Sequence, residues 1–246
     1  MRSMLLATAL AFGLGTAAQA AEITIVTPGF FGLGGVKELA EKYSKETGNK
    51  VTVDQEGMGQ MIDAVKKASD VVILPNDLMK QAVKDKLIDG STVKTLGRVD
   101  IVMIVPKGAK HPDISTVAKV AAAVKGAKQI AYSNPFTAEK SAQAMKIHDM
   151  LQRADFKPNN GKPPAKGNAV VGIKEGADMG FQLKTQINDP AVELVGSVPD
   201  QLGLFLDGDI AVSTIAKDKA AATAFINYLK SPASIAYFKS RGADVK

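Results

Sequence analysis

Short apolar runs alternate with amphipathic stretches along the chain. Residues 22–27 form a β-branched run, and residues 36–43 place apolar side chains at helical spacing. Further strand-like runs fall at 50–55, 70–74 and 100–105, with helix-like patterns between them. Because helices alternate with strands, this rhythm predicts an α/β fold with a mainly parallel sheet covered by helices.

The second half of the chain repeats the rhythm around a polar loop. Residues 157–166 are rich in Pro, Gly, Asn and Lys, which favours a surface loop. Ser231 followed by Pro232 is typical of a helix start. The other elements expected here are helices from 115 and at 138–154, 168–175, 220–229 and 232–239, and strands at 129–133, 178–182, 192–195 and 204–215.

The first twenty residues have the organisation of a signal peptide. Arg2 is followed by an apolar stretch over 4–18, and Ala18-Gln19-Ala20 fits the small-x-small cleavage rule. A membrane anchor is the alternative, but the uninterrupted apolar run is too short to span a bilayer. We therefore expect a signal peptide at 1–20, cleavage near Ala20 and a periplasmic mature protein.

The composition narrows the classes of function. It is 46% hydrophobic and 23% charged, which is typical of a globular protein. The absence of cysteine excludes disulfides, thiolate catalysis and zinc–thiolate sites. Because His111 and His148 are the only imidazoles, a site of several histidines is nearly excluded. We expect neither a metal nor a cofactor.

The net charge of +6 is spread over single lysines rather than blocks. Scattered lysines are typical of solvated helix faces, and the aromatic–basic interleaving that stacks nucleobases is absent. We therefore expect no nucleic-acid partner. A mild positive field suits a small anionic ligand.

Three segments share one design, in which a strand ends, a tight turn follows and a helix begins. They are 27–34, 56–60 and 133–141, and the third adds hydroxyls at Ser133, Thr137 and Ser141. The first amides of a helix have no partner within it, so such turns bind anions without a charged side chain. Plain helix capping is the alternative for each turn alone. None of the three matches a dinucleotide fingerprint or a phosphate loop.

Paired carboxylates are the other candidate chemistry. Asp207 and Asp209 flank Gly208 within an apolar run, which a hairpin turn or a bulge explains more simply. Asp70, Asp77 and Asp178 sit at strand ends, where turn and cap roles are common. No nucleophile is paired with a base, so the residues favour a protein that is not an enzyme.

Several segments together resemble one known group, the periplasmic solute-binding proteins of the molybdate-binding type. They occur in order over nearly the whole mature chain: 36–48, 50–53, 69–74, 112–117, 130–135, 175–180 and 222–232. The resemblance implies the type II periplasmic binding protein fold, in which two α/β lobes hold ligand in a cleft. It also implies release to an ABC transporter permease, and a monomer.

The resemblance also divides the chain into lobes. It implies a first lobe at 22–104 plus 206–246 and a second lobe at 105–205. The hinge strands would then be 99–105 and 204–215.

The family's ligand residues are only partly present. The resemblance places its first serine at Phe31, its second in Gly57-Met58-Gly59 and its late tyrosine at Leu183, beside Gln182 and Lys184. Backbone amides remain available at these turns. The residues expected to hold ligand are Thr27, Gly29, Phe30, Phe31, Met58, Gly59, Ser133, Thr137, Ser141 and Gln182.

Two ligand classes and two other functions stay open. A molybdate- or tungstate-like oxyanion is the family's usual ligand, whereas Phe30, Phe31 and Met58 favour a larger organic acid. Lys140 or Lys184 would neutralise a carboxylate. The rivals are a secreted enzyme, which would need one of the two histidines, and a protein-interaction module on the same scaffold.

Overall fold

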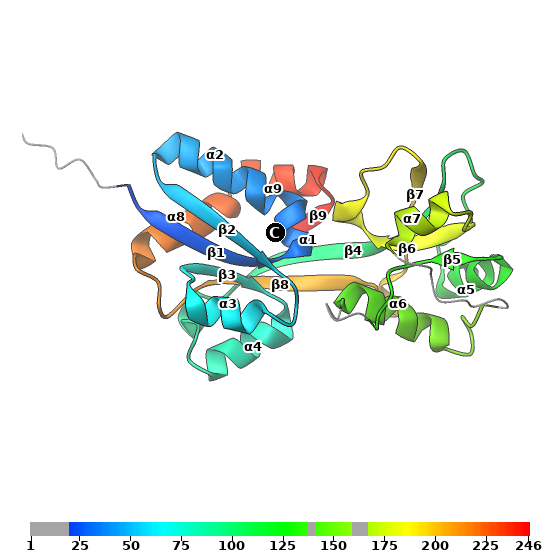
Figure 1. The fold of residues 1–246 in the computed structure, drawn as a ribbon, viewed down its shortest axis with the longest axis horizontal. Helices are drawn as coiled ribbons and strands as arrows, with labels where there is room; N and C mark the ends of the chain where they lie inside the picture. Colours follow the sequence, from blue (N-terminus) through cyan, green and yellow to red (C-terminus); the bar gives the residue numbers. More distant parts are fainter. Residues whose placement is uncertain (1–19, 137–140, 159–166) are drawn as a thin grey trace, which may run out of the picture.

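The computed structural model of the chain describes residues 20–136, 141–158 and 167–246. Figure 1 shows a long molecule in which strands β4 and β8 run through the middle. The strands are β1 (Glu22–Pro28), β2 (Lys50–Glu56), β3 (Val71–Leu74), β4 (Lys94–Pro106), β5 (Ile130–Ala131), β6 (Met179–Leu183), β7 (Val192–Ser197), β8 (Phe205–Val212) and β9 (Ala243–Val245).

Helices follow most of these strands, as the sequence predicts. The α-helices are α1 (Gly29–Phe31), α2 (Lys37–Thr47), α3 (Met61–Lys67), α4 (Asn76–Lys84), α5 (Val117–Gly126), α6 (Ala142–Gln152), α7 (Ala169–Lys174), α8 (Lys219–Leu229) and α9 (Pro232–Ser240). A π-helical turn, η1 (Gly32–Val36), joins α1 to α2. The 3-10 turns are η2 (Gly90–Thr92), η3 (Lys184–Gln186) and η4 (Asp200–Leu202).

The α/β class is correct, but the prediction of mainly parallel sheets, one in each lobe, is wrong. The described strands form one mixed sheet in the order β2-β1-β3-β8-β4-β6-β5, with β7 and β9 also paired to β4. Only β1–β2, β1–β3 and β5–β6 are parallel. Strand β4 is antiparallel to all four of its partners. Hydrophobic periodicity reports which face of a strand is buried and carries no information on its direction.

The central strand is longer than its apolar run. Residues 94–99 extend β4 beyond the expected 100–105, because Arg98 and its polar neighbours interrupt the pattern without ending the strand. The first part of β4 pairs with β8 and β9, and its last part pairs with β6 and β7. Gly208, expected in a turn or bulge, lies inside β8, opposite a register shift between Thr95 and Gly97.

Helices cover both faces of the sheet. Alternate residues of β1 divide between them: Ile23 and Ile25 belong to the core cluster that includes α2 and α8, whereas Val26 packs with α3 and α4. In a third apolar cluster, side chains of α7 pack against side chains of β4 and β5. This period of two along a strand is what places apolar side chains on both sides of a covered sheet.

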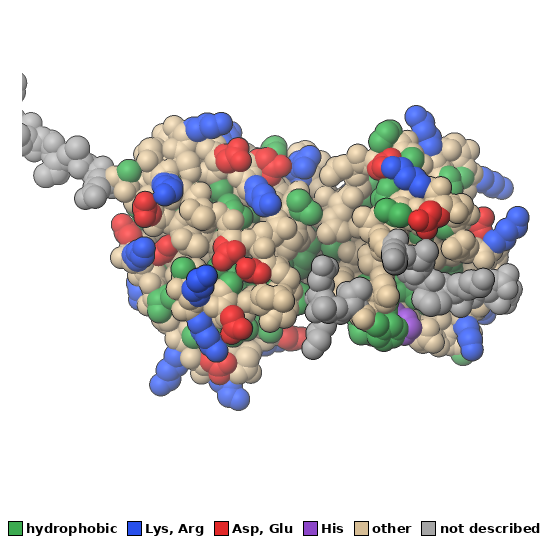
Figure 2. Space-filling model, in the orientation of Figure 1, with side chains coloured by type: hydrophobic (Ala, Val, Ile, Leu, Met, Phe, Trp, Pro, Cys, Tyr) green, Lys and Arg blue, Asp and Glu red, His purple; other side chains and the backbone are tan. Residues whose placement is uncertain are grey.

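The expected signal peptide lies outside the described residues, apart from Ala20. Within the described ranges, no helix has the length and hydrophobicity to cross a membrane. On the face in Figure 2, lysine and arginine side chains stand singly among acidic ones, which agrees with the scattered charge of the sequence.

Candidate functional site

A pocket of about 350 Å³ lies where the ends of β1 and β2 face the start of α6. Its residues come from segments far apart in the sequence, which the sheet brings together. They are Pro28, Gly29, Phe30, Gln55, Glu56, Gly57, Met58, Gln60, Ser141, Ala142, Gln143, Leu183, Gln186 and Leu206. Gly29, Phe30, Met58 and Ser141 are therefore the predicted site residues that line it.

The first wall follows from the parallel pairing of β1 and β2. Pro28 pairs with Glu56, so both strands end at the same edge of the sheet. Helix α1 begins directly at Gly29 after Pro28, with no loop between strand and helix. The first turn of this helix therefore faces the Gly57–Gly59 turn, as open α/β sheets place ligand sites at strand ends.

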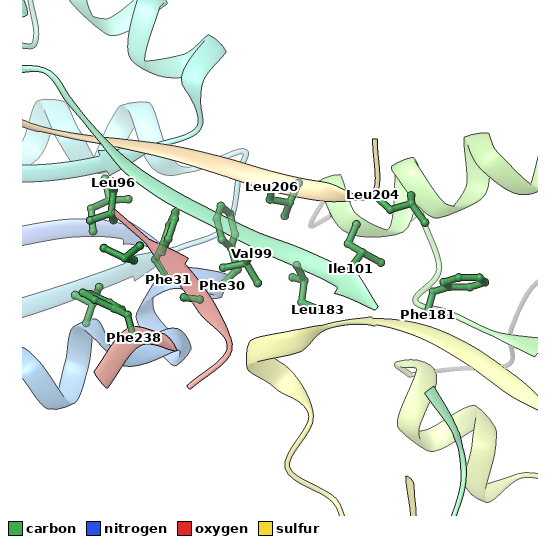
Figure 3. Packing of buried hydrophobic residues seen from close by; sticks show 14 of the residues in the cluster. Phe30, Phe31, Leu96, Val99, Ile101, Phe181, Leu183, Leu204, Leu206 and Phe238 are labelled. Atoms are coloured by element: carbon green, nitrogen blue, oxygen red, sulfur yellow. The ribbon is translucent and has the colours of Figure 1, made fainter. Parts of the chain in front are cut away.

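Two neighbouring predicted residues, Thr27 and Phe31, are fully buried and do not line the pocket. Figure 3 shows Phe31 beside Phe30 among the residues of the main apolar core. The two rings lie 4.9 Å apart between centroids, and Phe30 is 6% exposed. The sequence alone does not show which of the two adjacent phenylalanines faces the pocket. In the helical turn, Phe30 is directed to the pocket and Phe31 to the apolar core.

The turn after β2 offers backbone donors. Met58 lines the pocket, while Gly59 is exposed and lies outside the lining. Within the described part of the chain, the amides of Met58 and Gly59 donate to no acceptor. Such amides suit an anionic ligand.

The opposite wall is the first turn of α6. Ser141 lines the pocket and caps the helix, since its hydroxyl accepts from the Ala144 amide at 3.3 Å. Ser133 is half-buried and does not line this pocket. Thr137 and Lys140 lie outside the described residues.

Glutamines are the lining residues that the sequence analysis missed. Gln55, Gln60, Gln143 and Gln186 all line the pocket. The predicted Gln182 is 1% exposed and lies behind this wall, hydrogen-bonded to two of them. The sequence did offer one signal for them, since these glutamines lie near the ends of strands or at the starts of helices.

Gln55 lies against α1 because two glycines leave room for it. A Cβ atom on Gly32 would lie 2.3 Å from Gln55 Oε1, and one on Gly29 would lie 3.4 Å from its Nε2. The buried Oε1 atom has no hydrogen-bond partner among the described residues. Burying an unpaired acceptor costs about 1–3 kcal/mol. No hydrogen bond therefore holds this oxygen in place, and the Gln55 side chain is positioned by its packing against α1.

The pocket itself is lined by one charged residue of the described chain, Glu56. An adjoining space of about 280 Å³ shares Phe30 and Met58 with it and adds Lys146 and Asp207. The Lys146 ammonium donates to the Gly203 carbonyl at 3.1 Å. Lys184 instead lines a separate groove beside α9. The lining therefore offers amide dipoles rather than a cation.

Neither histidine lines this pocket. His111 lies 3.3 Å from Glu193, and the His148 ring packs edge-on against Phe136. Asp70 has a structural role: its carboxylate accepts from the Thr24 and Lys217 amides, both at 2.8 Å. In the ranges the structure describes, no group of three or more His, Cys, Asp or Glu side chains could hold a metal ion.

A pocket between helix starts at the edge of an α/β sheet is the usual place of a ligand site in such folds. The chain belongs to the bacterial extracellular solute-binding proteins, since the model of that family matches residues 34–243. The likeness to the molybdate-binding type, expected from the sequence, is confirmed.

Three relatives illustrate the spread of this family. Aconitate isomerase of a Pseudomonas species is 25% identical over 85% of this chain and 82% of its own length. The molybdate-binding protein of Azotobacter vinelandii is 26% identical over 93% of this chain and 92% of its own. The substrate-binding domain of a putative molybdenum ABC transporter from Clostridium difficile has a TM-score of 0.73 at 19% identity, covering 92% of this chain and 99% of that one.

Proposed function

We propose that this chain is the periplasmic solute-binding protein of an ABC importer and binds a small anion in the pocket. The observation that carries the proposal is the meeting of three predicted turns, at Phe30, Met58 and Ser141, around one space of about 350 Å³. Membership of the extracellular solute-binding family supports the transport role.

Amide groups are proposed to hold the ligand's charge. The first amides of α6 have no acceptor within the helix, and its dipole favours an anion at this end. Met58, whose amide is free, lies on the other wall. The carboxamides of Gln60 and Gln186 add further donors, so no lysine or arginine is needed in the pocket.

An organic acid fits the pocket better than a tetrahedral oxyanion. Phe30 and Met58 supply apolar surface, and Leu183 stands where the resemblance places the family's tyrosine. Four glutamines offer both donors and acceptors, whereas a bare oxyanion uses donors only. The two curated relatives leave both classes open, since one is named for aconitate and the other for molybdate.

Ligand binding is proposed to join two lobes, residues 22–104 plus 206–246 and residues 105–205. The pocket draws Phe30 and Met58 from the first and Ser141 and Gln186 from the second. A ligand that contacts both would stabilise a closed form through contacts that neither makes alone. The permease would then recognise this closed form of a monomer.

Secretion is part of the same proposal. The family is extracellular, and the leader at 1–20 would direct export with cleavage near Ala20. Sequencing the amino terminus of the protein recovered from the periplasm tests this, and a start far from Ala21 would contradict it.

A second candidate function is an isomerase acting on an unsaturated acid. Glu56 is the one carboxylate that lines the pocket among the described residues, and one relative is named aconitate isomerase. A carboxylate beside a bound acid can accept a proton from carbon. Incubation with cis-aconitate, followed by proton NMR, tests for conversion, and Glu56→Gln should abolish any conversion seen.

Thermal unfolding with a ligand panel tests the binding proposal. The panel is molybdate, tungstate, sulfate, phosphate and a series of mono-, di- and tricarboxylates. A ligand at a hundred times its Kd adds about 2.7 kcal/mol, which raises the Tm by several degrees. We expect a carboxylate to produce this shift. No shift with any anion would overturn the proposal and favour a protein-interaction module.

A further inference from the structure

Three glutamines form a hydrogen-bonded row along one wall of the pocket. Gln143 Nε2 donates to Gln182 Oε1 at 3.2 Å, and Gln182 Nε2 donates to Gln186 Oε1 at 2.6 Å. Gln143 and Gln186 line the pocket, whereas Gln182 lies buried behind them. The row links the start of α6 to β6 and η3.

A backbone amide fixes the direction of this row. The amide of Ala169, at the start of α7, donates to Gln182 Oε1 at 3.4 Å. A glutamine carboxamide can exchange its two ends, but a backbone N–H can only donate. Gln182 must therefore turn its oxygen toward Ala169 and Gln143, and its NH2 group toward Gln186.

This direction decides what the pocket presents to a ligand. Because the oxygen of Gln186 is engaged, its NH2 group is left as a donor. Because Gln143 donates to Gln182, its own oxygen is left as an acceptor with no partner among the described residues. The wall thus presents one fixed donor and one fixed acceptor, and Glu56 adds a second acceptor to the lining.

We infer that the ligand is a small hydroxy acid, whose carboxylate accepts from Gln186 and whose hydroxyl donates to Gln143. The inference rests on the proposed anion binding in this pocket and narrows it to one chemical class. A deprotonated oxyanion has no hydrogen to give, so it would leave the Gln143 oxygen buried and unpaired. A hydroxyl beside the carboxylate satisfies both groups.

Gln182 is a positioning residue in this arrangement. In Gln182→Glu the side chain can only accept, so Gln186 would turn its NH2 group toward residue 182 and its oxygen toward the pocket. The donor for the carboxylate would then be lost, although residue 182 itself contacts no ligand.

Isothermal titration calorimetry of the mature protein with matched acids tests the inference. L-malate and succinate differ by one hydroxyl, as do citrate and tricarballylate, and molybdate serves as the oxyanion. We expect the hydroxylated member of the better-bound pair to bind at least about tenfold more tightly, since the site is built to accept its hydrogen bond. Gln143→Met should remove that preference and leave the affinity for the deoxy acid within about threefold.

Gln152→Met is the matched control, because Gln152 is an exposed glutamine near the other end of α6. It should keep the wild-type preference. Gln182→Glu should weaken both members of a pair by at least about tenfold, with an unchanged circular dichroism spectrum.

Equal binding of the paired acids to the wild-type protein, or an unchanged preference in Gln143→Met, would overturn the hydroxy-acid inference and leave the anion site standing. Tight binding of molybdate with no binding of the acids would do the same. An absence of binding by every anion would overturn the proposed function itself, and the inference with it.

Discussion

The ring of Phe31 fills the space that a side chain on Gly208 would need. A Cβ atom on Gly208 would lie 2.3 Å from Cε2 of Phe31, which is fully buried. The first turn after β1 is thereby pressed against the central strand β8. The neighbouring residue, Phe30, is in turn held at the pocket wall.

Gly208→Ala should destabilise the protein. The added methyl group forces the Phe31 ring or the β8 backbone to move, and overpacking of this kind costs about 1–3 kcal/mol. The free energy of unfolding from urea denaturation measures the effect. Gly126→Ala is the control, because a Cβ atom there meets nothing within 4 Å. Equal stability of the two variants would contradict this prediction, because it would show that Phe31 can accommodate a methyl group at residue 208.

The turns that line the candidate pocket could be predicted from the sequence, but the directions of their side chains could not. Strand β1 ends at Pro28, α1 begins at Gly29, and the turn after β2 contains Gly57 and Met58. All four residues line the pocket, at the kind of sheet edge where open α/β folds bind ligands. Adjacent Phe30 and Phe31 look identical in a sequence. Their separation depends on Gly208, which lies far along the chain.

The glutamine wall and the directions of the strands could not be predicted from the sequence, for related reasons. Gln143 and Gln186 become one wall only through Gln182, and no local pattern announces a contact between residues 39 positions apart. Strand β4 pairs antiparallel with β8, although every element from α5 to η4 lies between them in the sequence. Local periodicity reports burial, so long-range pairing must come from the folded structure.

Arg98 of β4 forms ion pairs with Asp100 in the same strand and with Asp200 in η4. We expect the two pairs to contribute differently to the free energy of unfolding. The Arg98 Nε lies 3.0 Å from Asp100 and its Nη2 2.8 Å from Asp200, with side-chain exposures of 19% and 71% for the two aspartates. Arg98→Met should destabilise by about 1–2 kcal/mol, because the more buried Asp100 loses its countercharge.

Asp200→Asn should have little effect on stability, since an exposed ion pair is screened by solvent. Urea denaturation of both variants makes the comparison. A loss in Asp200→Asn as large as that in Arg98→Met would contradict the assignment of the stabilising contact to Asp100.

Asp209 of β8 should make the protein less stable as the pH rises through the acidic range. Burial raises the pKa of Asp209, and the charge of Asp207 raises it further, against the opposing effects of Thr95 and Lys80. An acid with a higher pKa in the folded state keeps its proton longer there than in the unfolded chain. The free energy of unfolding therefore falls between the unfolded and the folded pKa.

Asp209→Asn removes this titration and should raise stability at pH 7, with less gain at pH 3, where the wild-type carboxyl is already protonated. Thermal unfolding at both pH values measures it. Asp207→Asn should give a smaller gain, because it removes only the charge that raises the pKa of Asp209. A lower Tm for Asp209→Asn at pH 7 would contradict the prediction, because it would show that the ionised carboxylate stabilises the folded protein.

Ser141 has two roles that one substitution can separate. Its hydroxyl caps α6 through the Ala144 amide, and the same residue lines the pocket. Ser141→Ala loses the cap, at a cost of about 1 kcal/mol. Ser141→Asp keeps it, because a carboxylate also accepts from the helix amides and is favoured by the helix dipole.

In the pocket, however, Ser141→Asp adds a negative charge beside the proposed anion. We expect the affinity for the best-bound carboxylate to fall by at least about tenfold while the Tm is retained. Thr116→Asp is the matched control: Thr116 caps α5 through the Lys119 amide and does not line the pocket, so this variant should bind as tightly as the wild type. Since both variants carry the same added charge on a helix cap, a loss confined to Ser141→Asp locates the ligand at the start of α6. A loss of equal size in Thr116→Asp would instead assign the effect to the net charge of the protein.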